Sequence, residues 1–473
     1  MKKLSFVTAI PLLLAAFTAC SDQEVETGTG NTAATASFQP GQADLRIAVV
    51  GAGPSGLTAA YTLKQLGYTN VTVFEKEDHV GGKVLSFKAG PVAAELGAVY
   101  ASPDYRTVLG LADELGVAYT ANNLPRLVLD EQGRKLTFEQ FLRSRYSQAE
   151  VVSALQHYAA ALQEYAVIEQ NGFANLPPEL YTSFDEFSKA KGFAPVAQMA
   201  KSLFVGFGYG YYEDVPALYL MKLMGWLVKV GPNGLEAPPY FTFPDGYQSL
   251  WQKVAQQLNV RVSAKVTGIE RGCEGEAATC DQPVALTING TEHLTFDAVI
   301  ISAPLKAVPS FMTLTEDERA LFDKVQSSRY FATLFAAVHL AGEEVVFIHD
   351  HARPEKINHL SVWANPNKSL PVYIGYQLAD RQSGLFKLTA LMAWDILKLG
   401  GGVFGTIVKR QEWTDYFPRV TTEDLENGYF EQVEDLQGKQ GVFYVGSSLS
   451  FETVEHTARY AKGLVLTHFP PAQ

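Results

Sequence analysis

The sequence predicts an α/β fold in which one parallel sheet is assembled from stretches that lie far apart in the chain. Three observations support this fold class. An apolar run at 45–50 leads into a glycine-rich turn and a helix-patterned segment at 57–66. A second apolar run follows at 71–74, and a third, at 442–445, precedes a helix-patterned segment at 454–469. Short apolar runs that alternate with helices are typical of a parallel, doubly wound sheet.

The turn after the first strand has the spacing of a dinucleotide-binding site. Gly51 permits a tight turn, Gly53 lets the backbone approach a pyrophosphate, and Gly56 lets the helix pack closely on the strand. Free N–H groups at a helix N-terminus attract phosphate. Glu75, at the end of the second strand, is placed to accept hydrogen bonds from ribose hydroxyls. The predicted cofactor contacts also include Pro54, Ser55 and Lys76.

The segments that follow resemble glutathione-reductase-like and amine-oxidase-like flavoproteins. DHVGGK at 78–83 resembles the glycine-pair segment after the ribose-binding acid, and ELGA at 95–98 resembles a block beside the flavin. The strand and glycine turn at 442–447 stand where such folds direct a helix N-terminus at the flavin. The resemblance implies FAD, bound non-covalently. It assigns further cofactor contacts to Gly82, Lys83, Gly97, Ala98, Val266, Gly446 and Ser447.

The sequence departs from these families at two positions. Lys83 stands where they usually carry arginine, and Ser447 where they usually carry aspartate or glutamate after the glycine. The chain also has no second GxGxxG motif, so a separate nicotinamide domain is not expected. Electrons therefore pass to an external acceptor or return to the substrate.

The remaining segments differ in their periodicity. Residues 139–165 have apolar positions three and four apart, which is typical of helix, whereas 331–340 and 372–377 are rich in strand formers. We therefore expect a Rossmann-like FAD-binding domain with an inserted helical cap and a β-rich substrate domain. The expected boundaries are 45–103, 240–305 and 430–473 for the FAD-binding domain, 104–239 for the mainly helical cap and 306–429 for the substrate domain.

The first 20 residues have the pattern of an export signal. Two lysines precede the apolar run 4–17, and small residues then lead to Cys20. This pattern resembles a bacterial lipoprotein signal, which implies a lipid-modified Cys20 and a site in the cell envelope, at the periplasmic face of the outer membrane. Cleavage elsewhere, with a soluble periplasmic product, is the alternative. The polar segment 21–44 is expected to be a flexible linker.

The net charge, the cysteines and the histidines limit which partners and metal sites we expect. A net charge of −12 argues against nucleic acid as a partner. Cys273 and Cys280 flank a turn-like loop, where either a disulfide or two free thiols are possible; export favours the disulfide. The nine histidines show no metal-ligand spacing, and we interpret His349, His351 and His359 as polar loop residues.

Several longer segments resemble one group of the amine oxidase superfamily, the polyunsaturated fatty acid double-bond isomerases. They are GFGYGYYEDVPALYLMK at 206–222, ARPEKINH at 352–359, YFPRVTTEDLENGYFEQVEDLQG at 416–438 and FYVGSSLSF at 443–451. The resemblance spans roughly residues 45–470. It implies a redox-neutral reaction in which a hydride leaves one carbon of a fatty acid and returns to another, without a catalytic acid or base from the protein.

The resemblance also implies a site for the substrate carboxylate. The segment 124–130 matches the stretch in which the group carries a carboxylate-binding arginine, so Arg126 receives that role; a surface arginine is the alternative. Phe207 and Tyr209 are candidates to line the substrate channel, with core packing as the alternative. The group's aromatic clamp is missing at 231–239, so the mouth should differ. The rival functions are an oxidase that reduces oxygen and a non-enzymatic flavin-binding module.

Overall fold

The computed structural model describes most of the chain after the predicted signal and linker. The described residues are 43–231, 234–236, 239–272, 282–342, 344–367 and 370–472. They belong to one unit, Thr35–Gln473. The predictions for Cys20, Cys273 and Cys280 fall outside the described residues. Among the described helices, none combines the length and the apolar character needed to cross a bilayer.

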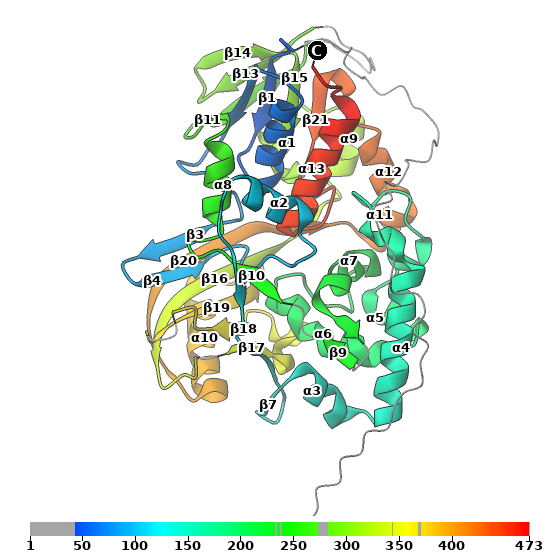
Figure 1. Ribbon diagram of the computed structural model, residues 1–473, viewed down its shortest axis with the longest axis vertical. Helices are drawn as coiled ribbons and strands as arrows, with labels where there is room; N and C mark the ends of the chain where they lie inside the picture. The colour runs from blue at the N-terminus through cyan, green and yellow to red at the C-terminus, as the bar shows by residue number, and fades with distance from the viewer. Residues whose placement is uncertain are drawn as a thin grey trace, which may run out of the picture. The chain divides into compact units, whose positions relative to one another are not determined.

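A five-stranded parallel sheet carries the glycine-rich turn (Figure 1). Strands β1 (Ile47–Val50) and β15 (Ala298–Ile301) are buried along their whole length, which is why both have continuous apolar sequences. Helices α1 (Pro54–Gln65) and α13 (Val454–His468) pack against each other beside this sheet. In spatial order the strands are β11 (Asn259–Arg261), β2 (Val71–Phe74), β1 (Ile47–Val50), β15 (Ala298–Ile301) and β21 (Val442–Tyr444). The α/β fold class and its parallel sheet are confirmed.

Helices dominate the segment after the first part of this sheet. Their N-termini are specified locally: the side chains of Thr137 and Ser147 accept backbone N–H groups and form capping boxes with Gln140 and Glu150. The helices are α2 (Arg106–Glu114), α3 (Phe138–Arg145), α4 (Gln148–Glu164), α5 (Phe184–Ala190), α6 (Ala194–Gly206) and α7 (Ala217–Leu227).

A second sheet has seven strands and combines two parts of the chain. Its β6 strand (Arg126–Leu129) comes from the range expected to be mainly helical. It pairs in parallel with β17 (Val345–Ile348) from the later β-rich range. That pairing places Arg126 beside Val345. Helix α10 (Leu385–Gly400) covers part of one face. The spatial order is β20 (Val403–Arg419), β16 (Gln326–Val338), β19 (Val372–Ala379), β18 (Val362–Ala364), β17 (Val345–Ile348), β6 (Arg126–Leu129) and β7 (Lys135–Leu136).

Smaller elements connect the two sheets. Strands β5 and β10 form an antiparallel pair, β12, β13 and β14 form a three-stranded sheet, and β3–β4 and β8–β9 are two-stranded. Their bounds are β3 (Ser86–Ala89), β4 (Val92–Glu95), β5 (Thr120–Asn122), β8 (Lys229–Gly231), β9 (Gly234–Glu236), β10 (Tyr240–Thr242), β12 (Val266–Glu270), β13 (Val284–Ile288) and β14 (Glu292–Phe296). The remaining α-helices are α8 (Gln248–Ala255), α9 (Glu316–Phe322), α11 (Thr422–Glu426) and α12 (Tyr429–Glu434).

Candidate active site

A cavity of about 1220 Å³ is lined by residues from both large sheets. This volume exceeds the usual range for a single small ligand, so a dinucleotide and a second molecule can share it. Gly56 and Arg126 are the two predicted site residues that do not line it. Those that do are Gly51, Gly53, Pro54, Ser55, Glu75, Lys76, Gly82, Lys83, Gly97, Ala98, Phe207, Tyr209, Val266, Gly446 and Ser447.

The glycine turn has the geometry that a pyrophosphate requires. Gly51 has a φ of +106°, a conformation that favours glycine. A Cβ on Gly56 would lie 2.0 Å from the carbonyl oxygen of Gly51, so only glycine fits between the helix and the turn. Gly53 is the N-cap of α1 and supplies no side-chain cap, which leaves N–H groups at the cavity wall available for an anion.

Glu75 is held in a fixed position at the end of β2. Its side chain is 7% exposed, and its two carboxylate oxygens accept the backbone N–H groups of Ala52 at 2.8 Å and Glu77 at 2.9 Å. A carboxylate oxygen has two lone pairs, so each oxygen can still accept a hydroxyl. Glu75 therefore ties the glycine turn to the second strand and can also bind ribose from its place in the cavity wall.

Lys83 contacts an acid that the sequence analysis did not identify. Its Nζ atom lies 2.6 Å from Glu452 Oε1 and donates to the carbonyl oxygen of Asp415 at 2.6 Å. Glu452 is nearly buried, and its other oxygen accepts the N–H of Phe417 at 3.1 Å. Both Lys83 and Glu452 line the cavity. The Lys83 charge is therefore neutralised by the protein, and the pair joins the FAD-binding region to the end of β20.

Four tyrosines form a stack in the wall of the cavity. Ring centroids are 5.8 Å apart for Tyr376 and Tyr330, 4.7 Å for Tyr330 and Tyr416, and 6.2 Å for Tyr416 and Tyr209. Burial raises the pKa of Tyr209, Tyr330 and Tyr416 well above 10, so these phenols are neutral. The sequence identified only Tyr209 of this stack as a site residue, because the four positions come from three strands and a loop.

Glu95 is a second titratable residue that sequence reasoning did not select, although its neighbours Gly97 and Ala98 were selected. Its carboxyl group lines the cavity and accepts hydrogen bonds from Ser86 Oγ at 2.6 Å and the Tyr247 N–H at 2.9 Å. Burial raises the pKa of Glu95 to about 7, against the opposing effect of these hydrogen bonds. Glu95 is therefore a carboxyl group in the cavity that titrates near neutral pH.

Arg126 lies behind two aromatic side chains of the cavity wall. Its guanidinium carbon is 4.0 Å from the ring centroid of Tyr240 and 5.2 Å from that of Tyr100. The Nη2 atom is buried and has no hydrogen-bond partner in the protein, whereas the Arg126 side chain also interacts with the Tyr100 hydroxyl and so opposes the rise in the Tyr100 pKa that burial causes. The segment 231–239 lacks the aromatic residue of the group, but Tyr240, which follows it, contacts Arg126 through its ring. Buried polar groups are nearly always paired, so this donor is available to an acceptor that a ligand supplies.

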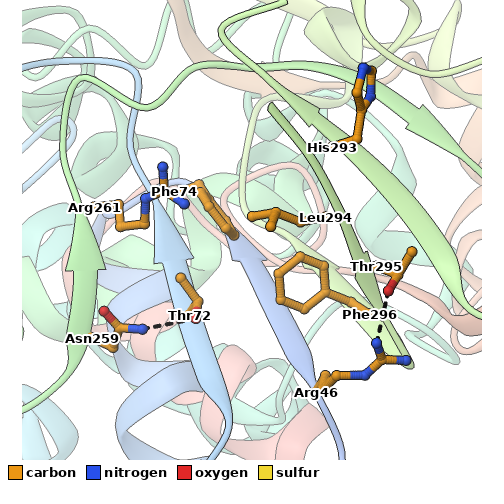
Figure 2. Close-up of a pocket in the computed structure, with 9 residues that line it drawn as sticks. All are labelled: Arg46, Thr72, Phe74, Asn259, Arg261, His293, Leu294, Thr295 and Phe296. Atoms are coloured by element: carbon orange, nitrogen blue, oxygen red, sulfur yellow. Dashed lines mark hydrogen bonds between the residues drawn. The ribbon is translucent and has the colours of Figure 1, made fainter. Parts of the chain in front are cut away.

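A smaller pocket of about 460 Å³ lies elsewhere and contains Arg46 and Arg261 (Figure 2). The guanidinium group of Arg46 pairs with Asp297 at 2.7 Å, and that of Arg261 pairs with Glu292 at 2.5 Å. Its cations are therefore already neutralised by the protein.

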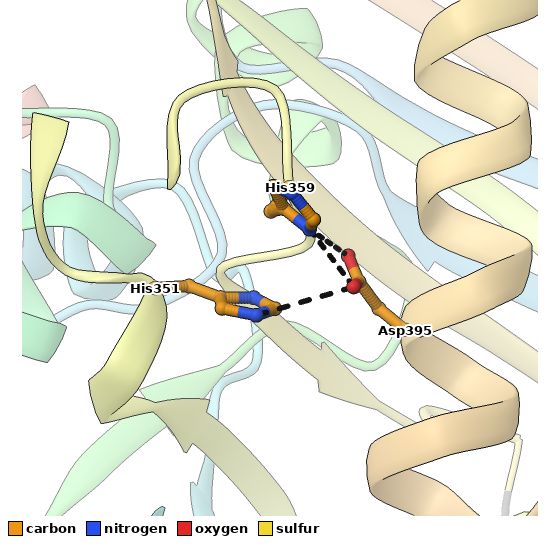
Figure 3. A group of neighbouring side chains, drawn as sticks. All are labelled: His351, His359 and Asp395. Carbon is orange, nitrogen blue, oxygen red and sulfur yellow. Dashed lines mark hydrogen bonds and ion pairs between the residues drawn. The ribbon is translucent and has the colours of Figure 1, made fainter. Parts of the chain in front are cut away.

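A largely buried side-chain cluster includes one residue of α10. His351 and His359 meet Asp395 there (Figure 3), and His359 Nδ1 lies 2.9 Å from an Asp395 oxygen. That distance is a direct hydrogen bond. The expectation of polar loop residues is wrong for His349 and His351, because both stand in a short 3-10 helix and are buried, whereas His359 is half-buried.

Known proteins that are similar to this chain include flavoenzymes. The family described as flavin containing amine oxidoreductase matches residues 54–374. The polyenoic fatty acid isomerase of Ptilota filicina is 24% identical over 492 aligned residues, covering 90% of this chain and 95% of its own length. The crystal structure of a CLA-producing fatty acid isomerase from P. acnes has a TM-score of 0.80 and 26% identity, covering 90% of this chain and 99% of that one.

Oxidases of the same fold are also similar, but one of them matches by sequence over a much smaller part of the chain. Putrescine oxidase from Kocuria rosea is 46% identical over 71 residues, which is 15% of each chain. A putrescine oxidase structure has a TM-score of 0.66 at 15% identity, covering 89% of this chain and 98% of its own. The glycine turn, its uncapped helix and the fixed acid fit FAD, and the family match covers most of the chain. The protein belongs to the flavin containing amine oxidoreductase family and is an FAD-dependent enzyme.

Proposed function

We propose that this enzyme is an isomerase that shifts a double bond within an unsaturated fatty acid or a related lipid carboxylate. The observation that carries the proposal is the buried, unpartnered Nη2 atom of Arg126 behind the cavity wall. An unpaired donor at that depth is costly until an acceptor binds. A carboxylate that displaces Tyr100 or Tyr240 from in front of Arg126 would satisfy the guanidinium group with two parallel hydrogen bonds and so fix one end of a fatty acid.

The rest of the cavity suits an acyl chain. Phe207, Leu223 and Phe347 contribute apolar surface, and the neutral tyrosine stack adds flat walls that exclude water. FAD, when bound, supplies reversible hydride transfer. Moving a double bond leaves the substrate at the same oxidation level, so no external acceptor is consumed. The protein's task is to hold one allylic C–H group in a reactive position, which anchoring at Arg126 and contact with the aromatic wall would achieve.

The relatives favour an isomerase over an oxidase. Two proteins named as fatty acid isomerases align over 90% of this chain. The Kocuria putrescine oxidase matches by sequence over 15%. An oxidase remains the rival that the assay must distinguish, because putrescine oxidase shares the fold.

The first experiment compares the two reactions directly. The purified FAD-loaded enzyme is incubated with linoleic acid and, separately, with putrescine, while conjugated-diene absorbance, oxygen uptake and peroxide are followed. An isomerase forms the diene at the same rate with and without oxygen and releases no peroxide. Peroxide from putrescine, with no diene from linoleic acid, would replace the proposal with an oxidase.

The second experiment tests Arg126. Replacing Arg126 with alanine removes a charge-assisted contact of about 1.5–3 kcal/mol, so KM for the fatty acid should rise roughly tenfold or more. Arg126→Lys should recover part of this loss. Arg143→Ala is the matched control, because Arg143 is half-exposed and pairs with Glu139 on α3. An unchanged KM in Arg126→Ala, with the flavin spectrum intact, would exclude Arg126 from substrate binding.

We also propose that the N-terminal segment delivers the enzyme to the bacterial envelope and that Cys20 carries a lipid. The proposal is supported by the apolar run 4–17 and the small residues before Cys20. Cells that express the full chain should incorporate labelled palmitate into the protein, and Cys20→Ser should abolish the incorporation. Equal labelling of both proteins would contradict the proposal.

A further inference from the structure

Helix α10 has large apolar side chains on its outward face. Phe386 is 89% exposed, and Leu385, Trp394 and Leu397 are each at least half exposed. The inward face is also apolar, because Leu388, Met392 and Ile396 are fully buried. A helix that is apolar on both faces is normally enclosed by protein or lipid. Within the described residues, no other element covers the outward face.

Three of these exposed residues form one continuous stripe with Ala390, which is also exposed. Phe386, Ala390, Trp394 and Leu397 recur at intervals of four, four and three residues, which places them on the same side of the helix. We call this stripe the α10 face. Lys387 and Lys398 follow one edge of it, and the Lys398 ammonium group lies 4.7 Å from the Trp394 ring. The pattern of aromatic and aliphatic residues with flanking lysines is typical of a helix that lies in a membrane interface.

The helix is fixed firmly to the body of the protein. Gln377, on β19, donates to the carbonyl oxygen of Leu388 at 2.9 Å. Asp395 is 2% exposed and accepts the N–H of Leu360 at 2.9 Å in addition to the His359 contact (Figure 3). The neighbouring β19 residue Tyr376 lines the cavity. Since side chains alternate along a strand, α10 lies on the face of the sheet opposite to the cavity.

The segment that contains α10 is rich in basic residues, in contrast to the whole chain. The chain carries a net charge of −12, yet residues 381–410 contain five basic residues and one acid, the inward-facing Asp395. No ion pair with a carboxylate is found for any of the five within the described part of the chain. They are Arg381, Lys387, Lys398, Lys409 and Arg410.

We propose that the α10 face docks onto the surface of an anionic phospholipid membrane, with the helix lying in the interface. The apolar stripe would enter the boundary between headgroups and acyl chains, while Lys387 and Lys398 extend to phosphate groups. The helix does not meet the requirements for crossing a bilayer. This inference goes beyond the proposed reaction and holds whichever lipid is the substrate.

A second copy of the chain fits the α10 face less well. In a two-fold dimer the same surface meets itself, so lysines would face lysines without exposed acids from this segment to pair with them. An anionic membrane satisfies both features at once, because it offers negative charge beside apolar depth. Lysine or arginine near such a surface contributes about 1 kcal/mol, or roughly a fivefold gain in partitioning, for each side chain.

The experiment measures binding of the full-length enzyme to vesicles. Vesicles of phosphatidylcholine alone are compared with vesicles of equal parts phosphatidylcholine and phosphatidylglycerol, by co-sedimentation and tryptophan emission. Trp394 is 55% exposed, whereas Trp226, Trp251 and Trp363 are buried. Insertion of α10 should therefore shift the emission to shorter wavelength with the anionic vesicles. Trp394→Phe should keep the binding and lose most of the shift.

Surface variants then test the two components of binding. Phe386→Ser with Trp394→Ser should reduce partitioning at least tenfold, and Lys387→Glu with Lys398→Glu should reduce it at least tenfold on anionic vesicles alone. Matched controls are Leu466→Ser and Lys253→Glu, which change exposed residues of α13 and α8. All variants keep the native N-terminus, so any contribution from that segment is constant.

Two results would overturn the proposal. If the α10 variants bind vesicles as well as wild type and Trp394 emission does not shift, the α10 face does not touch the membrane. If the enzyme is a dimer in solution without vesicles and Phe386→Ser with Trp394→Ser makes it a monomer, the face is an interface between copies. Neither readout depends on isomerase activity, so failure here and failure of the proposed reaction are distinguishable.

Discussion

At the residue scale, Glu95 shows how burial changes the chemistry of a single carboxyl group. Its hydrogen bonds to Ser86 and Tyr247 favour the ionised form, yet burial in the cavity wall outweighs them and raises the pKa to about 7 from 4.5. Between these two values the folded protein retains a proton that the unfolded chain releases. The free energy of unfolding should therefore fall as pH rises through this window.

Replacing Glu95 with glutamine tests this linkage. The amide is neutral at every pH and can keep hydrogen bonds to Ser86 and Tyr247. As pH rises from 4.5 to 7, the free energy of unfolding of wild type should fall by on the order of 3 kcal/mol relative to that of Glu95→Gln. Urea unfolding of both proteins across that range measures the difference. Parallel stability profiles would show that Glu95 does not retain its proton in the folded state.

At the scale of elements, α2 depends on a side chain from the other end of the chain. Its N-cap residue, Tyr105, provides no side-chain cap. Instead, the N–H groups of Thr107 and Val108 donate to the two oxygens of Glu455, each at 2.9 Å. Glu455 stands in the first turn of α13 and is 1% exposed. One carboxylate thus joins the N-terminal ends of two helices that are distant in sequence.

Removing this carboxylate should destabilise the protein. Glu455→Ala leaves one buried and one partly buried N–H group without acceptors, at about 1–3 kcal/mol each. We expect a loss of roughly 2–5 kcal/mol in the free energy of unfolding, measured by urea denaturation. Glu426→Ala is the control, because Glu426 is exposed at the end of α11. A loss in Glu455→Ala no larger than in the control would show that α2 is capped in another way.

At the scale of the whole molecule, the cavity is built from segments throughout the chain. Its wall includes Gly51 near the first strand, Tyr209 in the helical part, Tyr376 in the seven-stranded sheet and Ser447 near the C-terminus. A cofactor that contacts such separated segments binds the folded state alone. FAD should therefore stabilise the whole fold, by about 3 kcal/mol when its concentration is a hundredfold above Kd.

Thermal unfolding with and without FAD measures this stabilisation. The melting temperature of the flavin-free wild type should rise by several degrees on addition of FAD. Gly56→Ala should show a much smaller rise, because its Cβ would meet the Gly51 carbonyl oxygen. Gly110→Ala, whose Cβ meets nothing within 4 Å, should respond as wild type does. Equal responses of all three proteins would contradict the assigned role of the glycine turn.

The local parts of the fold and site follow from the sequence. The strand, glycine turn and helix at 47–65 and the strand and helix at 442–468 lie within three residues of the expected positions. Their conformations depend on interactions between near neighbours, such as the close contact of Gly56 with Gly51. The predicted cofactor contacts in these local elements line the cavity because the elements form as expected. Gly56 is the exception, since it does not line the cavity.

Only the tertiary structure decided the contacts between distant segments. It paired Lys83 with Glu452, placed Arg126 behind Tyr240, and joined β6 to the sheet that the later β-rich range forms. It also placed Glu95 in a partly buried position, which raises the pKa of its carboxyl group. No periodicity or short motif encodes such partners, because their proximity results from packing the whole chain around one core. The dinucleotide turn is therefore determined by local sequence, whereas the substrate end of the cavity exists only once both sheets have formed.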